Sequence, residues 1–406
     1  MLTEVQPTGE SPASIRLDVR SLATVVAASF ALTYPVCLWQ MFHSGGWIFG
    51  PNGHPSVTDF MVFWLAGCSA LKGTAAAAYV PQLHHAAEAA MSGHGFAGQL
   101  PWRNSPLFFL VAAPLALLPY MWAFIVWVAS SLALYSFVVW RIARVPMALI
   151  LACATPAVFL NAICGQNGAL TAALIGGALL TLERRPIVSG LLIGLLSYKP
   201  QFGILFPVVL LACGHWRTFV TAAVTCVAGA FISALIFGVD SWRAFLHYLP
   251  ITSNEILVHG INGFNKLQTM YGLIRWLGFD NNLAWAMQTG LIGIAGGTLF
   301  WLWRRDVPFA LKAAALPVAS LLVTPHLFMY DFPLLAVSYA FLYRQHAFDG
   351  MEFWSIGLAN LCMGAFLFLP TPIGLIALVI GAALIIRRTA QTQTANIPAH
   401  LSLQVA

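Results

Sequence analysis

Asp59 is the acidic residue whose sequence neighbours best suit it to chemistry. It follows a turn rich in Gly, Pro and Asn at residues 50–53 and precedes the aromatic pair Phe63 and Trp64. Thr58 or Asp59 would serve as the N-cap of the helix that follows. A carboxylate held beside aromatic rings at a membrane surface would also have a raised pKa, which suits it to accept a proton from a hydroxyl group. The two roles are compatible if Thr58 makes the cap.

Six of the 19 lysines and arginines are the second candidate set for chemistry: Lys72, Arg103, Lys199, Arg243, Lys266 and Arg275. Lys199 is the most informative, because it interrupts an apolar stretch, where an unpaired charge costs several kcal/mol. It should therefore face a cavity or a counter-ion, and a phosphate group is a natural partner. The alternative is a lysine at the membrane interface that extends its amine to lipid headgroups. Arg103 and Arg243 are the arginines that we expect to assist it.

Side-chain amides form a third set. Gln166 and Asn167 lie in a short turn between two apolar segments, and Asn265 and Gln268 lie in a longer polar stretch. Amides at these places would bind sugar hydroxyls or cap helix ends, and spacing does not separate the two roles.

A fourth set lies at the junction of two late apolar segments, where His326, Tyr330 and Asp331 follow Pro325. His326 would contact a phosphate or an acceptor hydroxyl. Asp331 would orient a neighbouring side chain or pair with a cation. The alternative for both is a structural polar contact between helices.

Signals for metals, cofactors and nucleotides are weak. His84, His85 and His94 are close in sequence, but we do not interpret them as a metal site. The chain has no phosphate-binding loop, no dinucleotide fingerprint and no serine hydrolase motif. We therefore expect neither a metal nor a cofactor, and no nucleic-acid partner is needed to explain the net charge of +6.

Composition fixes the environment in which these residues must work. Hydrophobic residues make up 60% of the 406 residues and charged residues only 8%, with a mean hydropathy of +0.81. A soluble domain has about a quarter of its residues charged, so this chain must use lipid as its solvent. The composition predicts an all-α, polytopic membrane bundle.

Twelve apolar segments are candidates for membrane crossings. They are 21–42, 121–140, 146–161, 167–182, 186–198, 200–213, 217–238, 283–303, 309–324, 332–344, 352–369 and 371–387. Several are short and end at proline, which suggests a bundle that lines a cavity.

The distribution of basic residues predicts the orientation of the bundle. Thirteen of the 19 lysines and arginines share one set of short connections if residues 105–118 dip into the membrane and return: Arg16, Arg20, Arg141, Arg144, Arg184, Arg185, Arg217, Arg304, Arg305, Lys312, Arg344, Arg387 and Arg388. This bias marks the cytoplasmic face. It leaves two large outer loops, 43–104 and 239–282.

The expected domain organisation is one transmembrane domain at residues 21–388. Residues 1–20 and 389–406 are polar, and we expect both to be disordered and cytoplasmic. The first apolar segment lacks a small-residue cleavage site, so we expect a retained helix.

Short motifs recur in a fixed order along the chain. They are Asp59-Phe60, Trp64-x-Ala66-Gly67, Tyr79, Asn104-Ser105-Pro106-Leu107-Phe108, Pro114-Leu115-Ala116, Gly165-Gln166-Asn167, Gly190-Leu191-Leu192, Lys199-Pro200, Pro325-His326 and Tyr330-Asp331. Over roughly residues 20–345 this order resembles glycosyltransferase family 87. That family belongs to the GT-C fold group and includes polyprenyl-phosphate-mannose-dependent mannosyltransferases of the phosphatidylinositol mannoside pathway.

The resemblance implies a lipid-linked sugar donor, a catalytic outer face and inversion at the anomeric carbon. We expect the acceptor to be a lipid or glycan and the protein to lie in the bacterial inner membrane. It implies that Asp59 is the essential aspartate, and it matches Lys199-Pro200 and His326 to family positions. Where the family often shows Tyr-Pro-Pro, this chain has Asn104-Ser105-Pro106, which affects contacts near Arg103.

The resulting hypothesis is a membrane glycosyltransferase with Asp59 as general base. Lys199, Arg103 and Arg243 would bind the donor phosphate, and the expected substrate-binding residues are His326, Gln166, Asn167, Asn265, Gln268, Trp64 and Asp331. Mannose is the first candidate sugar. One alternative is a transporter or flippase, although transporters usually place polar sites between repeats at the bilayer midplane and no repeat is present. Another is a non-catalytic assembly partner.

Overall fold

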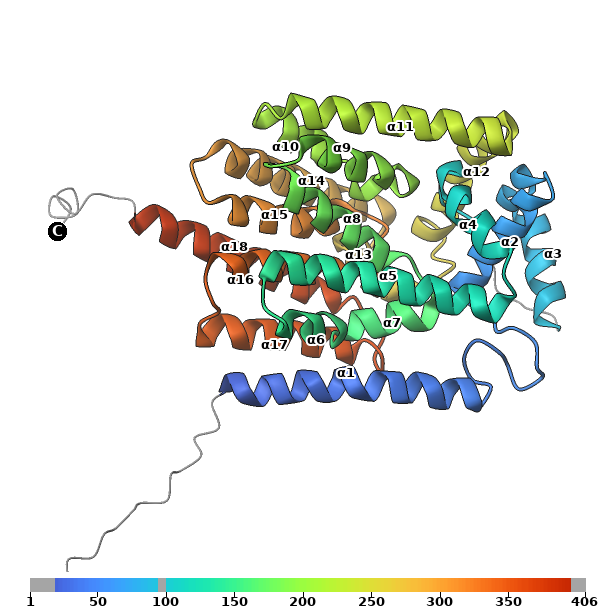
Figure 1. The fold of residues 1–406 in the computed structure, drawn as a ribbon, viewed down its shortest axis with the longest axis horizontal. Helices are drawn as coiled ribbons and strands as arrows, with labels where there is room; N and C mark the ends of the chain where they lie inside the picture. Colours follow the sequence, from blue (N-terminus) through green and yellow to red (C-terminus); the bar gives the residue numbers. More distant parts are fainter. Residues whose placement is uncertain (1–18, 94–99, 396–406) are drawn as a thin grey trace, which may run out of the picture.

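The computed structural model describes residues 19–93 and 100–395, and helices make up most of this part of the chain (Figure 1). The α-helices are α1 (Val19–His43), α2 (Asp59–Leu71), α3 (Pro81–Ser92), α4 (Phe109–Ala116), α5 (Tyr120–Ala143), α6 (Met147–Cys153), α7 (Pro156–Cys164), α8 (Gly168–Thr181), α9 (Pro186–Leu195), α10 (Phe206–Ala212), α11 (Trp216–Phe237), α12 (Val239–Leu257), α13 (Met270–Trp276), α14 (Asn281–Arg304), α15 (Phe309–Val323), α16 (Pro333–Gln345), α17 (Gly350–Ala365) and α18 (Gly374–Ala395). The 3-10 helices are η1 (Ala75–Tyr79), η2 (Pro106–Phe108), η3 (Leu196–Tyr198), η4 (Pro200–Phe202), η5 (Phe264–Lys266) and η6 (Met329–Asp331). The described residues contain no β-strand, only an isolated bridge between Phe49 and Pro55.

Proline sets many of the helix boundaries. It occupies the first turn of α3, α7, α9 and α16, where its missing N–H would have no partner within the helix. Because proline also restricts the residue before it, consecutive helices are separated by sharp turns. This local chemistry explains why the apolar segments fold into many short helices.

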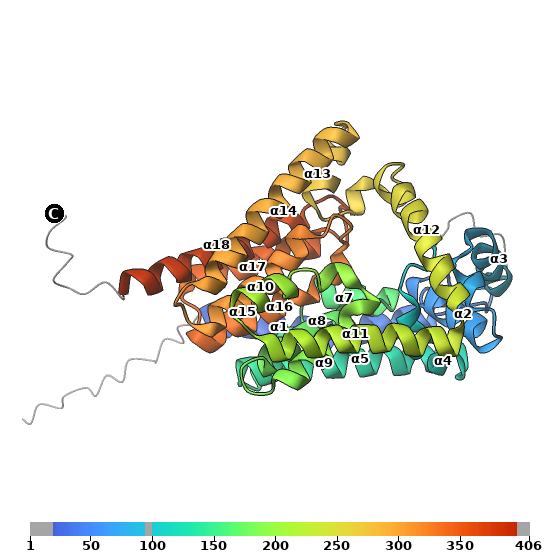
Figure 2. The same ribbon diagram turned by 90° about the horizontal axis from the view of Figure 1, so that it is seen from above.

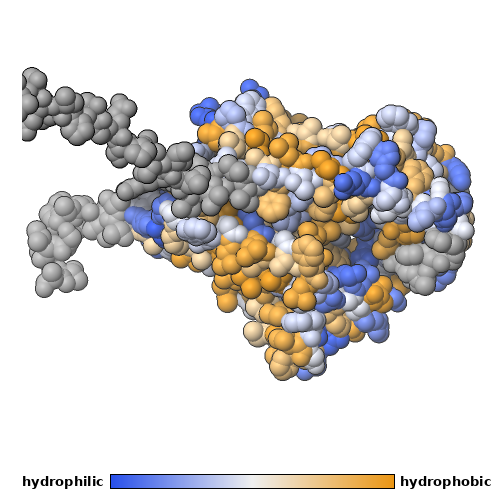
Figure 3. Space-filling model, turned by 90° about the horizontal axis from the view of Figure 1, so that it is seen from below, coloured by the Kyte–Doolittle hydropathy of each residue, from blue (hydrophilic) through white to orange (hydrophobic). Residues whose placement is uncertain are grey.

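Within the described residues, four helices are long and apolar enough to cross a membrane: α5, α11, α14 and α18. The pair α6 and α7 would count as a fifth span, bent by 60° at the break between them. In α11 only 6% of the apolar window is buried, and Val220, Val224 and Phe231 are exposed on it. These side chains would face lipid. In Figure 3, apolar residues cover a broad middle zone and polar residues gather toward both ends.

Each of the twelve apolar segments predicted from the sequence coincides with a helix or with two consecutive helices. The count of twelve crossings is not confirmed, because most of these helices are shorter than the roughly 20 residues that an isolated span needs. Several of the short helices are shielded by the rest of the bundle, and α8 is buried along most of its length. A helix surrounded by protein does not need to match the lipid thickness.

The two segments predicted as large loops are mostly helical. Residues 43–104 contain α2, η1 and α3, and residues 239–282 contain α12, η5 and α13. Residues 105–118 form η2 and the eight-residue α4, which packs against α2. Figure 1 shows α2, α3 and α4 together at one end of the bundle, which we call the α2–α4 end. Figure 2 shows α13 and α14 projecting from the bundle on one side.

A buried ion pair connects α17 and α18 at the opposite end of the bundle. Arg388 donates through Nε and Nη2 to the two carboxylate oxygens of Glu352, at 2.6 Å each. Its Nη1 also donates to the carbonyl of His346 at 3.1 Å, and both charged side chains are almost fully buried. Arg387 pairs with Asp349 at 2.8 Å nearby. The helix α18 continues past Arg388 to Ala395, so residues 389–395 of the tail predicted to be disordered are helical. The rest of that predicted tail, and residues 1–18 of the predicted disordered lead, lie outside the described residues.

We expect Glu352→Gln to lower the free energy of unfolding by about 3–5 kcal/mol, because it leaves the buried Arg388 guanidinium without a counter-charge. Denaturant unfolding of the purified protein in detergent measures this loss. Asp349→Asn is the matched control, since its pair with Arg387 is partly exposed and such pairs contribute about 0–1 kcal/mol. Equal losses in the two variants would contradict the assigned importance of the buried pair.

Candidate active site

Five segments that are far apart in the sequence bring polar side chains together near the α2–α4 end. They are the start of α2, the segment before η2, the turn between α7 and α8, the junction of η3 and η4, and the segment from α15 to η6. Their side chains interact through hydrogen bonds, ion pairs and charge. We call this set the polar cluster: Asp59, Arg103, Asn104, Gln166, Asn167, Lys199, His326, Tyr330 and Asp331.

A buried aromatic group supports the backbone segments that carry the polar cluster. Phe108 of η2 stacks on Tyr198 of η3, with ring centroids 5.0 Å apart. The ring of Phe63 on α2 makes T-shaped contacts with Phe108 and with Trp102, with ring centroids 5.2 Å and 6.0 Å apart. All four rings are almost completely buried. Since large rings bury much apolar area and pack in specific orientations, they fix α2, η2 and η3 relative to one another.

The turn between α7 and α8 requires glycine at position 165. Gly165 ends α7 with a φ of 65°, a conformation that residues with a Cβ adopt at a cost. A Cβ there would also lie 2.6 Å from the Cβ of Phe60. The Gly165 carbonyl accepts a hydrogen bond from Trp127 Nε1 at 2.8 Å. This locked turn presents Gln166 and Asn167 to the polar cluster.

Lys199 has a counter-ion inside the protein. Its Nζ lies 2.6 Å from Asp331 Oδ1 and donates to Asn167 Oδ1 at 3.0 Å. The amine also lies over the Phe202 ring, 5.0 Å from its centroid. The Lys199 side chain is only 13% exposed, so it does not extend to lipid headgroups as the alternative interpretation required. The ion pair with Asp331 holds this positive charge in place.

Arg103 is held by His326. The Nη1 of Arg103 lies 3.0 Å from Nε2 of His326. A guanidinium only donates, so His326 must accept through Nε2 and carry its proton on Nδ1. Burial and the positive charges of Arg103 and Lys199 lower the pKa of His326 well below its ordinary value, which keeps the ring neutral. The buried Nε of Arg103 has no partner in the described part of the chain, and it remains a donor for an anion.

Asp59 is the first residue of α2, after Thr58 at the N-cap position. The Thr58 side chain makes no capping hydrogen bond, and its hydroxyl lies 3.5 Å from that of Tyr120. Burial raises the pKa of Asp59 from 3.8 to about 6, while a hydrogen bond from Gln166 and the charge of Arg103 oppose the rise. A carboxylate in this range is charged at neutral pH and still basic enough to accept a proton.

Four of the site residues predicted from the sequence make their described contacts outside the polar cluster. Trp64 Nε1 donates to the carbonyl of Leu118 at 3.1 Å, which fastens α2 to the turn before α5. Arg243 is exposed on α12 and pairs with Asp240, three residues earlier, at 2.8 Å.

The other two, Asn265 and Gln268, connect the η5 segment to the turn between α17 and α18. Asn265 donates to the carbonyl of Pro370 at 3.1 Å. Gln268 is fully buried, and its amide bonds to the carbonyl of Thr371 and the N–H of Gly374. These contacts fit the structural alternative for the two amides, whereas Gln166 and Asn167 lie in the polar cluster.

Two members of the polar cluster received no role from the sequence. Asn104 accepts a hydrogen bond from Asn167 Nδ2 through Oδ1 at 3.2 Å, and its carbonyl accepts from the Tyr79 hydroxyl at 2.8 Å. The Lys199 amine lies over the ring of Tyr330, 6.0 Å from the ring centroid. Both residues stand next to predicted ones, so adjacency to Arg103 and Asp331 was the available signal.

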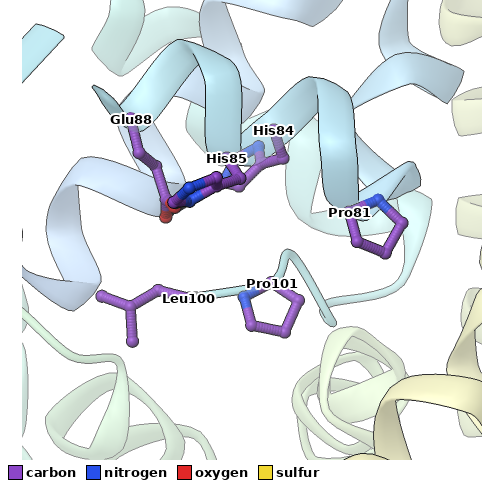
Figure 4. Close-up of a pocket in the computed structure, with 6 residues that line it drawn as sticks. All are labelled: Pro81, His84, His85, Glu88, Leu100 and Pro101. Carbon is purple, nitrogen blue, oxygen red and sulfur yellow. Dashed lines mark ion pairs between the residues drawn. The ribbon is translucent and has the colours of Figure 1, made fainter. Parts of the chain in front are cut away.

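The described residues contain no three His, Cys, Asp or Glu side chains arranged to hold a metal ion. Figure 4 shows a small pocket between α3 and the segment at Leu100 and Pro101, where two histidines and a glutamate lie close together. There Glu88 Oε1 lies 3.8 Å from His84 Nε2. Burial raises the pKa of Glu88 to about 7 and lowers that of His84 to about 4, so His84 is neutral at neutral pH and Glu88 is only partly ionised. The sequence interpretation had overlooked Glu88 as the carboxylate beside these histidines.

The polar cluster combines a carboxylate poised to accept a proton with a guanidinium that has a free donor. Such a pair suits a group transfer in which a hydroxyl loses its proton while an anionic group departs. Aromatic rings and side-chain amides lie within the polar cluster, and such groups offer apolar faces and hydrogen-bond partners to a sugar.

Comparison with known families matches residues 102–325 to glycosyltransferase family 87. The matched stretch includes Arg103, Gln166, Asn167 and Lys199, begins after Asp59 and ends one residue before His326. Searches of curated proteins and of solved structures gave no match. The family match covers more than half of the 406 residues and agrees with the apolar helices described above. The chain therefore belongs to glycosyltransferase family 87 and is a membrane glycosyltransferase.

Proposed function

We propose that this enzyme transfers a sugar, with inversion, from a polyprenyl-phosphate sugar donor to a hydroxyl group of a lipid or glycan acceptor. Asp59 is the general base in this proposal, and Arg103 stabilises the departing phosphate. The observation that carries the proposal is the placement of the Asp59 carboxylate within electrostatic reach of a guanidinium whose buried Nε has no partner among the described residues.

The reaction is a single displacement. Asp59 takes the proton of the acceptor hydroxyl as its oxygen bonds to the anomeric carbon of the donor sugar. The bond between that carbon and the phosphate oxygen breaks, and the electron pair leaves with the polyprenyl phosphate. Stabilisation of charge that develops on a leaving group in a water-poor site is often the largest catalytic contribution.

Lys199 and His326 have different parts in this mechanism. Lys199 supplies positive charge near the leaving phosphate, although its ion pair with Asp331 already neutralises part of that charge. His326 is neutral, so it does not itself neutralise a phosphate; its Nε2 orients the Arg103 guanidinium instead. Gln166 offers an amide group beside Asp59, and Asn167 follows it in the same turn; sugar or acceptor hydroxyls would bind there.

The family resemblance and the apolar surroundings support a lipid-linked donor. Exposed apolar side chains along α11 and α14 provide a surface for a polyprenyl chain at the membrane. Mannose is our first candidate sugar because it is the best-known sugar of the resembling enzymes.

We also propose twelve crossings of a bacterial inner membrane, with the α2–α4 end and its polar cluster on the extracytoplasmic face. The bias of basic residues toward the other set of connections supports this orientation. In Figure 1, the start of α1 and the end of α18 lie together at the end opposite to α2, α3 and α4.

We expect Asp59→Asn to reduce sugar transfer by about 10²–10⁴-fold, because an amide cannot accept the hydroxyl proton. Transfer from a panel of polyprenyl-phosphate sugars to membrane lipid extract, assayed with purified protein, measures the loss. Asp240→Asn on α12 is the control, since that carboxylate is exposed. Turnover like that of the wild type in Asp59→Asn would exclude Asp59 as the base.

The pKa of Asp59 sets the expected dependence of the rate on pH. Because the base works only when deprotonated and its pKa is about 6, kcat/KM should fall about tenfold for each pH unit below that value. Initial rates between pH 4.5 and about 8 test this, with circular dichroism to show that the fold persists. A rate that stays constant from neutral pH down to about 4.5 would contradict the assignment.

Arg103 and Arg243 provide a matched test of the phosphate site. Arg103→Gln should lower kcat by about 10²–10³-fold, since a buried donor aimed at developing charge is lost. Arg243→Gln removes an exposed guanidinium that pairs with Asp240, and activity should stay near that of the wild type. Equal losses in the two variants would show that Arg243 also serves the donor phosphate.

A further inference from the structure

Three helices converge at the end of the bundle opposite to α2, α3 and α4. Helices α5, α8 and α16 pack against one another in pairs. Gly176 of α8 marks the junction: a Cβ on it would lie 2.8 Å from Val138 of α5 and 3.3 Å from Val337 of α16. Because only a glycine leaves room for this approach, the three C-terminal ends are brought together.

Each of the three helix ends carries arginine. Arg141 and Arg144 end α5, Arg184 and Arg185 follow α8, and Arg344 lies in the last turn of α16. We call these five residues the arginine cluster. The charges of Arg144 and Arg184 act directly on the Arg344 guanidinium, and Glu183 opposes them. No arginine of the cluster has an ion pair within the described ranges 19–93 and 100–395.

The favourable interaction of arginine with helix C-termini accounts for only part of the positive charge of the arginine cluster. Arginine is favourable at a helix C-terminus, which carries about half a negative charge. Three helix ends therefore offset about 1.5 positive charges. Five arginines against Glu183 leave four positive charges (5 − 1 = 4), so about 2.5 remain uncompensated (4 − 1.5).

The backbone conformation of Arg144 also supports a role for the arginine cluster beyond helix capping. Arg144 is the only residue other than glycine with a positive φ, at 61°, among the described residues. It occupies the C-cap of α5, where glycine is the usual residue because a Cβ costs about 1–2 kcal/mol in this conformation. Arginine at this strained position is consistent with a contribution from its side chain that glycine would not supply.

The arginine cluster lies at a membrane surface. Helix α5 is long and apolar enough to span a membrane, so its C-terminal end must lie near the boundary between lipid and water. Exposed apolar residues adjoin the arginines: Phe137 is one turn before Arg141, and Ile187 follows Arg185 after one proline. Arg141 lies over the Phe137 ring at 5.7 Å. A ligand of this surface must combine negative charge with apolar chains.

We propose that the arginine cluster binds the phosphate headgroup of an anionic phospholipid whose acyl chains lie against the neighbouring apolar side chains. Arginine suits phosphate because its planar guanidinium donates two hydrogen bonds at once. Basic pockets between membrane helices bind anionic headgroups for the same reason. The bound lipid would connect the ends of α5, α8 and α16 across their mutual repulsion.

The test is thermal unfolding of the purified protein in mixed micelles that contain either phosphatidylglycerol or phosphatidylcholine. For the wild type, we expect phosphatidylglycerol to raise Tm by about 2–4 °C above the value in phosphatidylcholine. The double variant Arg184→Gln/Arg344→Gln should lose this difference. The control, Arg304→Gln/Arg305→Gln, removes the same charge from the end of α14 and should retain it. Equal differences in all three proteins would overturn the proposal.

Two further arms separate lipid binding from other effects. Glycerol phosphate, a soluble headgroup analogue, should give no comparable rise in Tm; an equal rise would show a site for free phosphate and would overturn the lipid assignment.

Arg144→Gly should leave Tm in phosphatidylcholine unchanged or higher, because it relieves the positive φ, while reducing the rise with phosphatidylglycerol. A full rise in that variant would show that the Arg144 side chain takes no part. These readouts do not involve sugar transfer, so they stand apart from the proposed reaction.

Discussion

The cost of placing charge in an apolar interior governs how this protein is built. Only 8% of the residues are charged, and several of the buried ones have identifiable partners. Lys199 pairs with Asp331, Glu352 pairs with Arg388, and Arg103 bonds to a neutral histidine. The pairs Lys199–Asp331 and Arg103–His326 join segments that are distant in sequence, and Glu352–Arg388 joins the consecutive helices α17 and α18. The same electrostatic requirement that limits charge therefore also specifies which segments must meet.

Asp59 and Arg103 are two charges of the polar cluster whose compensation is incomplete, and they lie within electrostatic reach of one another. The pKa of Asp59 is raised because burial outweighs the help of Gln166 and of the nearby cations. Arg103 keeps one buried donor without a partner among the described residues. Incomplete compensation of two neighbouring buried charges is the feature expected of a site that awaits ligand charge.

Rigid surroundings make such a site tolerable. The stacked rings of Phe108 and Tyr198 and the glycine turn at Gly165 hold the segments that carry the polar cluster. At the other end of the molecule, Gly176 brings three helix ends together and thereby concentrates arginines. Small residues at close contacts and large rings at supporting positions thus produce two chemically different surfaces from one bundle.

The sequence by itself determined the environment, the helical class, the family and the residue types of the polar cluster. It did so because apolar composition, proline boundaries and short motifs are local properties. Only the tertiary structure decided which of those residues meet. It joined Lys199 to Asp331 across 132 positions and Arg103 to His326 across 223. It gave Arg243 and Gln268 other partners, on α12 and at the turn before α18. Partners for buried polar groups are chosen by packing between distant segments, and no local pattern encodes that choice.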